Sequence, residues 1–178
     1  SARKFIGYGQ RAMKDYERAL MLLSNIKDDW ETRGLVLSNA ATAYADQGDV
    51  DSADSFFNES IASARRLNNE VAEATRRGNY GYFLLLTARP QQALSALEYA
   101  LRLSQKLELT LQAAIQTDNL GLLYDQEGNY PKGLALHREA LTVIEPLKSV
   151  HWEQVVRLNL AGSLLATNQL EEARAFLE

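Results

Sequence analysis

Four asparagines recur at intervals of 40 residues: Asn39, Asn79, Asn119 and Asn159. Their side chains could hold a polypeptide backbone. A carboxamide carries both hydrogen-bond donors and an acceptor, so it can pair with the N–H and C=O groups of an extended peptide whatever the side chains of that peptide are. The same amides could instead satisfy neighbouring backbone carbonyls or bridge adjacent helices. Repetition supports both interpretations, because a structural role would also recur in every unit.

No pattern typical of catalysis accompanies these amides. The two histidines, His137 and His151, lack ligand partners at metal-binding spacing. His137 lies 40 residues after Leu97 and 80 residues after Phe57, so it is expected to pack in the core as they do. His151 is expected near the start of a helix. Cysteine is absent, which excludes disulfides, thiolate metal sites and cysteine nucleophiles. Phosphate-binding glycine loops and nucleophile elbows are also missing. We therefore expect no enzyme activity, no metal and no cofactor.

The composition and charge of the chain argue against some classes of partner. The chain has 178 residues, 46% of them hydrophobic, and a formal net charge of −4. No basic cluster is present that could neutralise phosphates, so nucleic acid is not an expected partner. There is no run of 18 apolar residues and no signal-peptide pattern over residues 1–10, so no membrane association is expected. These features predict a cytoplasmic protein that binds neither nucleic acid nor a membrane.

When the segments that follow the four asparagines are aligned, residues of similar size stand at the same positions. This agreement identifies an internal repeat. A large residue stands five positions after each asparagine: Tyr44, Leu84, Tyr124 and Leu164. Small residues stand two positions and fourteen positions after each asparagine: Ala41, Gly81, Gly121 and Ala161, then Ala53, Ala93, Gly133 and Ala173. Small residues let two helices approach closely where they cross, and large residues fill the space beside that crossing.

Each repeat is predicted to be a helical hairpin, because its apolar residues recur at steps of three and four. Gly48 and Gly128 suit the left-handed residue that ends a helix, as Asn168 does less well, and Asp49 and Asn129 suit the N-cap of the next helix. The predicted helix pairs are 30–47 with 50–67, 70–87 with 90–107, 110–127 with 130–145, and 150–167 with 170–178. Pro90 and Pro131 fit first helical turns, and Pro146 should end or kink a helix near Glu145.

The order of small, large, Gly, small and aromatic residues resembles the tetratricopeptide repeat. The best matches are "NAATAYADQGDVDSADSFFNESI" (39–61) and "NLGLLYDQEGNYPKGLALHREAL" (119–141). The usual period is about 34 residues, and the longer period here is similar to that of kinesin light chains and of bacterial regulators and peptide receptors. A weaker copy precedes these, in which Gly7, Lys14 and Ala19 match Ala41, Gly48 and Ala53, while Phe5 and Gln10 depart from the pattern.

This resemblance implies an all-α fold: an α-solenoid, in which about five antiparallel helical hairpins stack into a right-handed superhelix. The expected organisation is a single array over residues 1–178. It comprises a divergent first hairpin at 1–28, full repeats at 29–68, 69–108 and 109–148, and a truncated last hairpin at 149–178.

The resemblance also implies that the four asparagines line the concave face and contact an extended peptide of roughly ten residues, given helix spacings of about 8–10 Å. Related proteins that bind a terminal carboxylate use lysines and arginines on the concave face, and this chain lacks them there. Arg76 and Arg77 only flank the face and are expected to be solvated. Apolar anchors on the peptide are therefore favoured. Tyr82 is the leading anchor candidate. The other predicted contact residues on this face are Thr42, Thr75, Ile115 and Leu122.

Two other functions remain open. The chain could be a structural module that self-associates through its uncapped terminal hairpin. It could also be a small-molecule sensor, with a closed pocket around Tyr82 and Tyr124. Because a capping helix is expected after a repeat array and none follows Leu177, we interpret the sequence as part of a larger multidomain regulator.

Overall fold

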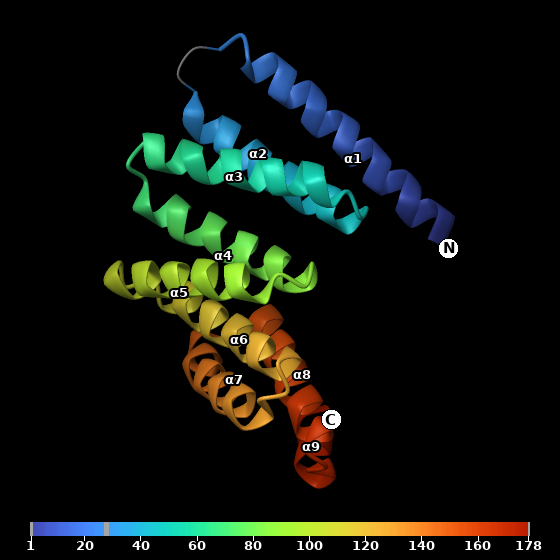
Figure 1. The fold of residues 1–178 in the computed structure, drawn as a ribbon, viewed down its shortest axis with the longest axis vertical. Coiled ribbons are helices and arrows are strands. Elements are labelled where there is room, and N and C mark those ends of the chain that lie inside the picture. The colour runs from blue at the N-terminus through green and yellow to red at the C-terminus, as the bar shows by residue number, and fades with distance from the viewer. Residues whose placement is uncertain (1, 27–28, 178) are drawn as a thin grey trace. The chain divides into compact units, whose positions relative to one another are not determined.

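The computed structural model describes residues 2–26 and 29–177, with side chains for 11–26 and 29–176. This part of the chain forms α-helices and one short 3₁₀ helix, η1, and it contains no β-strand (Figure 1). The predicted all-α class is therefore confirmed, and the helix ends lie close to those predicted. The helices are α1 (Ala2–Leu23), α2 (Trp30–Asp46), α3 (Val50–Arg66), α4 (Glu70–Leu86), α5 (Pro90–Lys106), α6 (Thr110–Gln126), α7 (Tyr130–Ile144), η1 (Glu145–Leu147), α8 (Val150–Ala166) and α9 (Leu170–Leu177).

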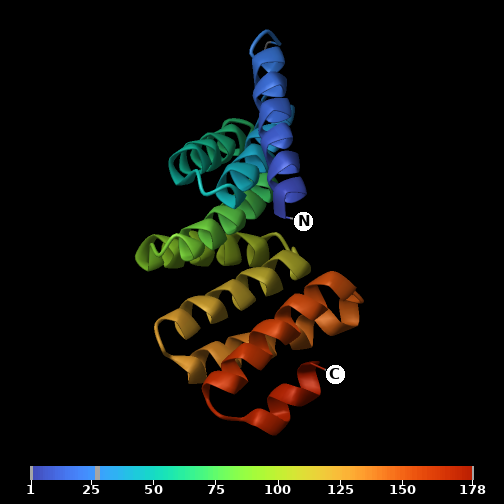
Figure 2. The same cartoon turned by 90° about the vertical axis from the view of Figure 1, so that its right-hand side faces the viewer.

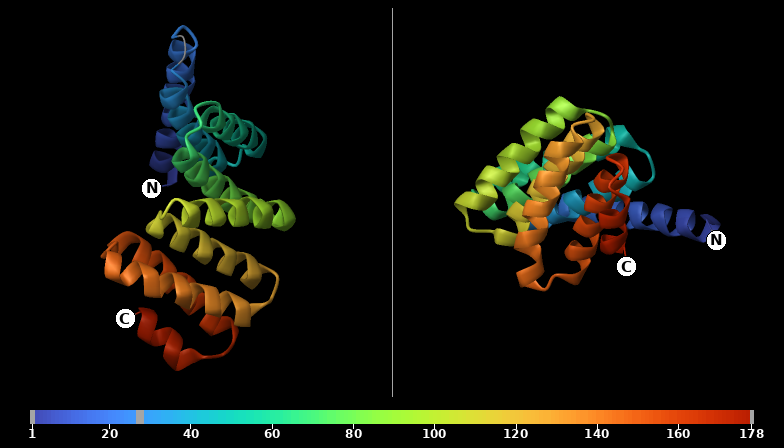
Figure 3. Two further views of the ribbon diagram at one scale, coloured as in Figure 1. Left: turned by 90° about the vertical axis from the view of Figure 1, so that its left-hand side faces the viewer. Right: turned by 90° about the horizontal axis from the view of Figure 1, so that it is seen from below.

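The chain divides into an N-terminal unit, Ser1–Thr87, and a C-terminal unit, Ala88–Glu178. In the N-terminal unit α2 contacts α1, α3 and α4. In the C-terminal unit α6 contacts α5, α7 and α8 (Figure 2), and α9 folds back on α8 (Figure 3). Stacked antiparallel hairpins of this kind define an α-solenoid. The division falls in the turn between α4 and α5, inside the predicted repeat 69–108.

A residue with positive φ stands at the same place in every turn from α2 to α9. The predicted positions Gly48 and Gly128 have φ of 79° and 78°, and Asn168 has φ of 60°. The amides of Asp49 and Asn129 bond back to the carbonyls of Tyr44 and Tyr124, at 3.0 and 2.8 Å, which closes each helix end. Two such turns therefore occur in each repeat, one after each of its helices. The further positions are Asn68, Ala88, Glu108 and Lys148, with φ between 51° and 56°.

Ala88 is strained relative to the glycines at its equivalent positions, because its Cβ disfavours the left-handed conformation. We expect Ala88→Gly to raise the free energy of unfolding by about 1 kcal/mol, measured by urea denaturation. Gly128→Ala is the matched reciprocal change and should lower it by a similar amount, since a Cβ there would meet no atom within 4 Å and the cost is conformational alone. Equal stability of Ala88→Gly and the parent would contradict this.

Local sequence signals explain most helix starts and one early end. The Asp49 carboxylate accepts a hydrogen bond from the Ser52 amide at 3.1 Å, as predicted for an N-cap. Asn129 occupies the N-cap of α7, although its side chain forms no capping hydrogen bond. Pro146 ends α7 at Ile144 and leaves a single 3₁₀ turn, η1, because proline cannot donate the next helical hydrogen bond.

The small and large positions of the repeat form the core. The predicted small residues Ala41, Gly81, Gly121 and Ala161 are all buried, as are Leu84 and Leu164 among the large ones. Burial of such apolar side chains contributes about 1.5–3 kcal/mol each for the large residues. In the C-terminal unit one continuous cluster joins α6, α7, α8 and α9, and its buried members are Ala114, Leu134, Ala140, Leu141, Ile144, Val156, Leu160, Leu164 and Ala173.

Residues 2–23 form one continuous helix, where the sequence pattern predicts a divergent hairpin over 1–28. Lys14, the expected counterpart of Gly48, lies within α1, and lysine has no preference for the left-handed conformation that would end a helix there. The helix packs on α2, and the Tyr44 hydroxyl donates to Glu17 Oε1 at 2.5 Å. Burial and this bond raise the pKa of Tyr44 to about 12. Of the other matched positions, Ala19 lies within α1 and is half-buried, whereas Phe5, Gly7 and Gln10 lie outside the described side chains.

Candidate functional site

The four periodic asparagines occupy equivalent helix positions but different environments. Asn39 on α2 and Asn79 on α4 are exposed, and within the described residues neither amide forms a hydrogen bond. Asn119 on α6 is only 8% exposed, and its Nδ2 donates to Gln116 Oε1 at 3.4 Å. Asn159 on α8 is half-buried, and its Nδ2 donates to Asp118 Oδ2 at 2.8 Å. The fixed spacing therefore does not impose one role on all four.

The exposed asparagines belong to a surface that we call the α2–α4 face. It contains Leu35, Asn39 and Thr42 on α2, and Val71, Thr75, Asn79, Tyr82 and Leu86 on α4, all of them exposed. Helices α2 and α4 contact each other and both pack on α3, so these exposed stripes lie on the side away from α3. The Thr42 and Thr75 hydroxyls donate to carbonyls of their own helices, those of Ser38 and Val71. The face thus presents two free amides among apolar side chains.

The predicted contact residues of the C-terminal unit are less accessible. Ile115 and Leu122 on α6 are half-buried, and Asn119 between them is buried. Asn159 bridges α8 to α6 through Asp118, which is the structural role considered as the alternative for these asparagines. Because its amide already satisfies a buried carboxylate, peptide binding there would require that bond to be exchanged.

A buried polar network surrounds His137, where the sequence pattern favours simple packing. The imidazole is fully buried, as expected for its position, but both ring nitrogens face carboxylates. Nδ1 lies 2.6 Å from Asp118 Oδ1, and Nε2 lies 3.2 Å from Asp125 Oδ2. Asn159 and Ser163 of α8 donate to the same two carboxylates, so the network joins α6, α7 and α8. Its members come from three helices that the sequence pattern treats as separate packing elements.

Geometry favours a protonated imidazole in this network. Ionised carboxylates only accept hydrogen bonds, so both ring nitrogens must carry a hydrogen to donate to Asp118 and Asp125. Burial alone lowers the pKa of His137, but the hydrogen bonds and negative charges of Asp118 and Asp125 outweigh it and raise the pKa above its usual 6.5. The network is therefore an ionic connection between helices.

The network does not have the geometry of a catalytic triad, although it contains serine, histidine and aspartate. The Ser163 hydroxyl donates to Asp125 and not to the imidazole, so the imidazole is not positioned to take its proton. Ser163 and His137 are 1% and 0% exposed, which leaves no access for a substrate. We interpret the arrangement as structural.

Two glycines make room for the network. A Cβ on Gly121 would lie 2.6 Å from Cε1 of His137, and a Cβ on Gly133 would lie 1.9 Å from Oδ1 of Asp125. Small residues at these positions were expected to let helix backbones approach each other. In this repeat they also accommodate a buried histidine and a buried carboxylate, and any larger residue at either position would displace them.

The N-terminal unit has a buried charged side chain of its own. Arg76, expected to be solvated, is 6% exposed, and its Nη1 donates to the Ser60 carbonyl and to Ser63 Oγ, both at 2.9 Å. Burial lowers the pKa of Arg76, and the charge of Glu31 opposes this. Gly34 provides the space, since a Cβ there would lie 2.4 Å from Arg76 Nη1. The expectation failed because α4 turns this side chain toward α3.

No group of three histidine, aspartate or glutamate side chains suited to a metal ion occurs in the part of the chain that the structure describes. A cavity of about 490 Å³ does occur in the C-terminal unit, between α5, α6 and α7. Tyr124, one of the two tyrosines expected to line a sensor pocket, is not among its lining residues.

Comparison with known families identifies the repeat. Tetratricopeptide-repeat family models match residues 35–71 and 154–178. The chain is a tetratricopeptide-repeat protein. The matched segments cover α2 with α3 and α8 with α9, which are the hairpins that the sequence pattern also resolves. No curated protein sequence matched this tetratricopeptide-repeat protein significantly.

Solved structures share the fold of this tetratricopeptide-repeat protein. BtubC from P. vanneervenii has a TM-score of 0.79 at 21% identity, over 98% of this chain and 72% of its own. A putative kinesin light chain from Podospora anserina has a TM-score of 0.74 at 18% identity, over 99% of this chain and 87% of its own. A Rap protein complexed with competence and sporulation factor has a TM-score of 0.84 at 16% identity, over 98% of this chain and 50% of its own.

These likenesses confirm the predicted α-solenoid fold. Tetratricopeptide-repeat scaffolds typically serve protein–protein interaction and are generally non-catalytic. Among the helices described, none combines the length and hydropathy needed to cross a membrane. The choice of partner depends on the exposed side chains and not on the fold.

Proposed function

We propose that this tetratricopeptide-repeat protein is a non-catalytic binding module that holds an extended peptide of a partner protein on the α2–α4 face. The observation that carries the proposal is the pair Asn39 and Asn79, which are exposed, equivalent and free of hydrogen bonds within the described residues. Asparagine is a mediocre helix former, so an exposed one inside a helix gains nothing from its backbone position. A bound peptide backbone gives both amides partners.

The spacing of the two helices fits an extended peptide. Packed helices lie about 8–10 Å apart, and an extended chain rises about 3.3 Å per residue. Asn39 and Asn79 would then bond peptide groups about three residues apart. In this arrangement the two asparagines contact only the peptide backbone, and the residues that flank them determine which peptide sequences are preferred.

Those flanking positions favour apolar anchors. Leu35 and Leu86 are exposed to more than half of their surface, and Tyr82 presents an exposed aromatic ring beside Asn79. Aromatic side chains are frequent binding hot spots because they bury a large area at a small entropic cost. The face lacks lysine and arginine, so recognition of a terminal carboxylate by a basic clamp is disfavoured. The Rap protein solved with competence and sporulation factor supports the use of this fold for ligand binding.

Peptide selection tests the proposal. Peptides of about ten residues selected from a displayed random library on the full chain should bind Asn39→Ala/Asn79→Ala about tenfold to a hundredfold more weakly, since each lost hydrogen bond contributes about 1 kcal/mol. Fluorescence anisotropy measures the affinity, and thermal unfolding checks that the double variant is folded.

Asn58→Ala is the matched control, because Asn58 is an exposed asparagine on α3, outside the α2–α4 face. Its affinity for the selected peptides should equal that of the parent. Unchanged affinity of the Asn39/Asn79 variant, combined with a lower unfolding temperature, would show that these two asparagines are structural.

A further inference from the structure

Equivalent junctions between successive hairpins carry ion clusters at the same repeat positions. At the α3–α4 junction Arg65 Nε and Arg77 Nε both donate to Glu73 Oε1, at 2.8 and 2.9 Å. Glu73 is 8% exposed, so this carboxylate is buried between two guanidinium groups. The cluster lies at the α3–α4 junction, where Arg65 and Glu73 also line a cavity of about 800 Å³.

The α7–α8 junction shows this arrangement again, two repeats further along the chain. Arg157, the equivalent of Arg77, donates to Glu153 and to Glu145, both at 3.0 Å. Glu153 is the equivalent of Glu73, and Glu145 takes the place of Arg65. Both junctions therefore place an arginine side chain against a glutamate at the same two positions.

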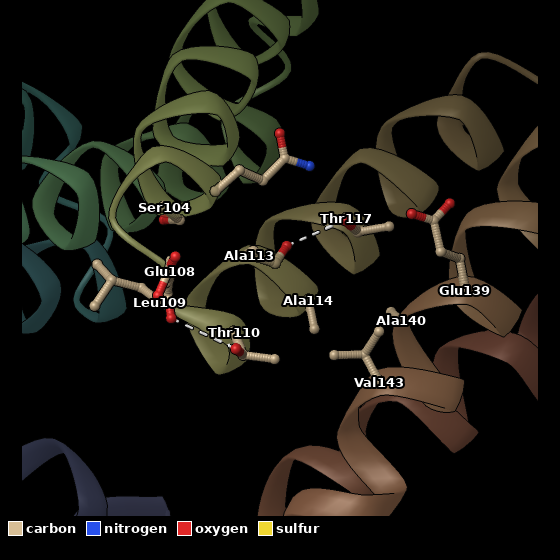
Figure 4. A pocket seen from close by; sticks show the side chains of 11 residues that line it. Ser104, Glu108, Leu109, Thr110, Ala113, Ala114, Thr117, Glu139, Ala140 and Val143 are labelled. Carbon is tan, nitrogen blue, oxygen red and sulfur yellow. Dashed lines mark hydrogen bonds between the residues drawn. The ribbon is translucent and has the colours of Figure 1, made fainter.

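The middle junction, between α5 and α6, has lost these charges. Gln105, Ala113 and Thr117 stand at the positions of Arg65, Glu73 and Arg77. All three line the cavity of about 490 Å³ between α5, α6 and α7, which Figure 4 shows. Ligand sites commonly have volumes of about 300–1,000 Å³. The α5–α7 cavity thus lacks the arginine and glutamate side chains that the neighbouring junctions hold at these positions.

The lining of the cavity favours a cation with an apolar stem. Its charged members are two glutamates, Glu108 and Glu139, and no lysine or arginine lines it, so the formal charge of the lining is −2. Arg138, the neighbour of Glu139, is paired with Glu172 at 2.6 Å. The last turn of α5 also lines the cavity, and a helix C-terminus carries partial negative charge. The apolar members are Leu109, Ala113, Ala114, Ala140 and Val143.

One buried polar group in the cavity lacks a partner. The Ser104 side chain is 0% exposed, and its hydroxyl forms no hydrogen bond to any described residue. Ile144 occupies the equivalent position one repeat later, so an apolar residue would satisfy packing here. Buried hydroxyls are normally hydrogen-bonded. A donor that enters the cavity and displaces the atoms covering this hydroxyl would provide the missing partner.

We propose that the α5–α7 cavity binds the guanidinium group of an arginine side chain from a partner polypeptide. Arginine is the residue that the neighbouring repeats place at this position, at 77 and 157. Its planar fork of donors suits a carboxylate acceptor, here Glu108 or Glu139 on the two sides of the cavity (Figure 4). Its methylene groups suit the alanines of the wall. The site uses none of the residues of the α2–α4 face and goes beyond the proposed peptide-binding function.

Titration of a capped amino acid tests the proposal on the full chain. Acetyl-arginine methylamide should cause saturable NMR shifts at the amides of Ala113, Ala114 and Thr117. Acetyl-citrulline methylamide, which has nearly the same shape and no charge, should cause none. The double variant Glu108→Gln/Glu139→Gln should bind the arginine probe about tenfold more weakly or worse, because charge-assisted hydrogen bonds become neutral ones. Glu127→Gln is the matched control, since Glu127 is exposed and outside the cavity.

Rebuilding the neighbouring ion cluster provides a second test. Ala113→Glu/Thr117→Arg should fill the cavity with an internal guanidinium, abolish binding of the probe and leave the unfolding temperature unchanged or higher. Equal binding of citrulline and arginine, unchanged binding by Glu108→Gln/Glu139→Gln, or binding by a folded Ala113→Glu/Thr117→Arg variant would each overturn the proposal. Propylguanidinium, a free guanidinium compound with the same single charge, should bind no more tightly than the capped arginine; tighter binding would assign the cavity to a small molecule.

Discussion

Replacing Asp118 with alanine is expected to lower the free energy of unfolding of the C-terminal unit by roughly 3–5 kcal/mol. Asp118 accepts hydrogen bonds from two groups on two other helices, the His137 imidazole at 2.6 Å and the Asn159 amide at 2.8 Å. Its removal leaves the buried His137 nitrogen and the half-buried Asn159 amide without this partner, and the histidine loses the closer of its two counter-charges. Removing one member of a buried ion pair costs more than the intact pair contributes.

Tryptophan fluorescence can assign this loss to the correct unit. Trp152 packs against the core cluster of the C-terminal unit, whereas Trp30 begins α2 in the N-terminal unit. Urea unfolding followed by Trp152 in a Trp30→Phe background therefore reports the C-terminal unit. Asp46→Ala, at an exposed aspartate on α2, is the control and should change stability by less than about 0.5 kcal/mol. A loss of under about 1 kcal/mol for Asp118→Ala would show that the network contributes no more than a surface pair.

The stability of the same unit is expected to fall as pH rises from about 6.5. Asp118 and Asp125 raise the pKa of His137 in the folded state above its unfolded value. The folded protein therefore holds this proton more tightly than the unfolded chain, and the resulting stabilisation is complete below the unfolded pKa. It is lost as pH rises through the higher folded pKa, at about 1.4 kcal/mol for each pH unit that separates the two values.

Urea unfolding followed by Trp152 fluorescence between about pH 6 and about pH 9 measures this dependence. The control is a triple variant, Asp118→Ser, Asp125→Leu and His137→Leu. The new residues are those found at the equivalent positions of other repeats, which are Ser38, Leu85 and Leu97. This triple variant should lose the decline assigned to His137 and retain its fold, because apolar packing often substitutes for buried ion pairs. His151→Asn removes the other, exposed histidine and should keep the decline. An identical decline in the triple variant would rule out His137 as its source.

Much of the helical framework could be predicted from local signals. Each turn from the end of α2 to the start of α9 contains a left-handed residue, and residues such as Gly48, Gly128, Asp49 and Pro146 mark these helix ends and starts directly. The recurring pattern of small and large residues likewise predicted the buried positions. Helix α1 is the exception, because its match to the repeat lacked both the asparagine and the turn-forming residue.

The polar network left a signal in the sequence that only comparison between repeats could reveal. His137 replaces Phe57 and Leu97, and Asp125 replaces Leu85 and Leu165. A basic and an acidic residue thus replace apolar ones in the same repeat. Each substitution alone is compatible with an exposed or a buried position, so the pairing required the distances between α6 and α7.

The sequence alone determined the repeat, the helix ends and the apolar core, because these depend on residues close together in the chain and on a pattern that recurs. Tertiary structure decided which polar side chains remain free. Asn39 and Asn159 share a repeat position, yet one is exposed and the other is bound to Asp118. Whether an amide or a charge is satisfied depends on the side chain that a neighbouring helix places opposite it, and no local pattern specifies that neighbour.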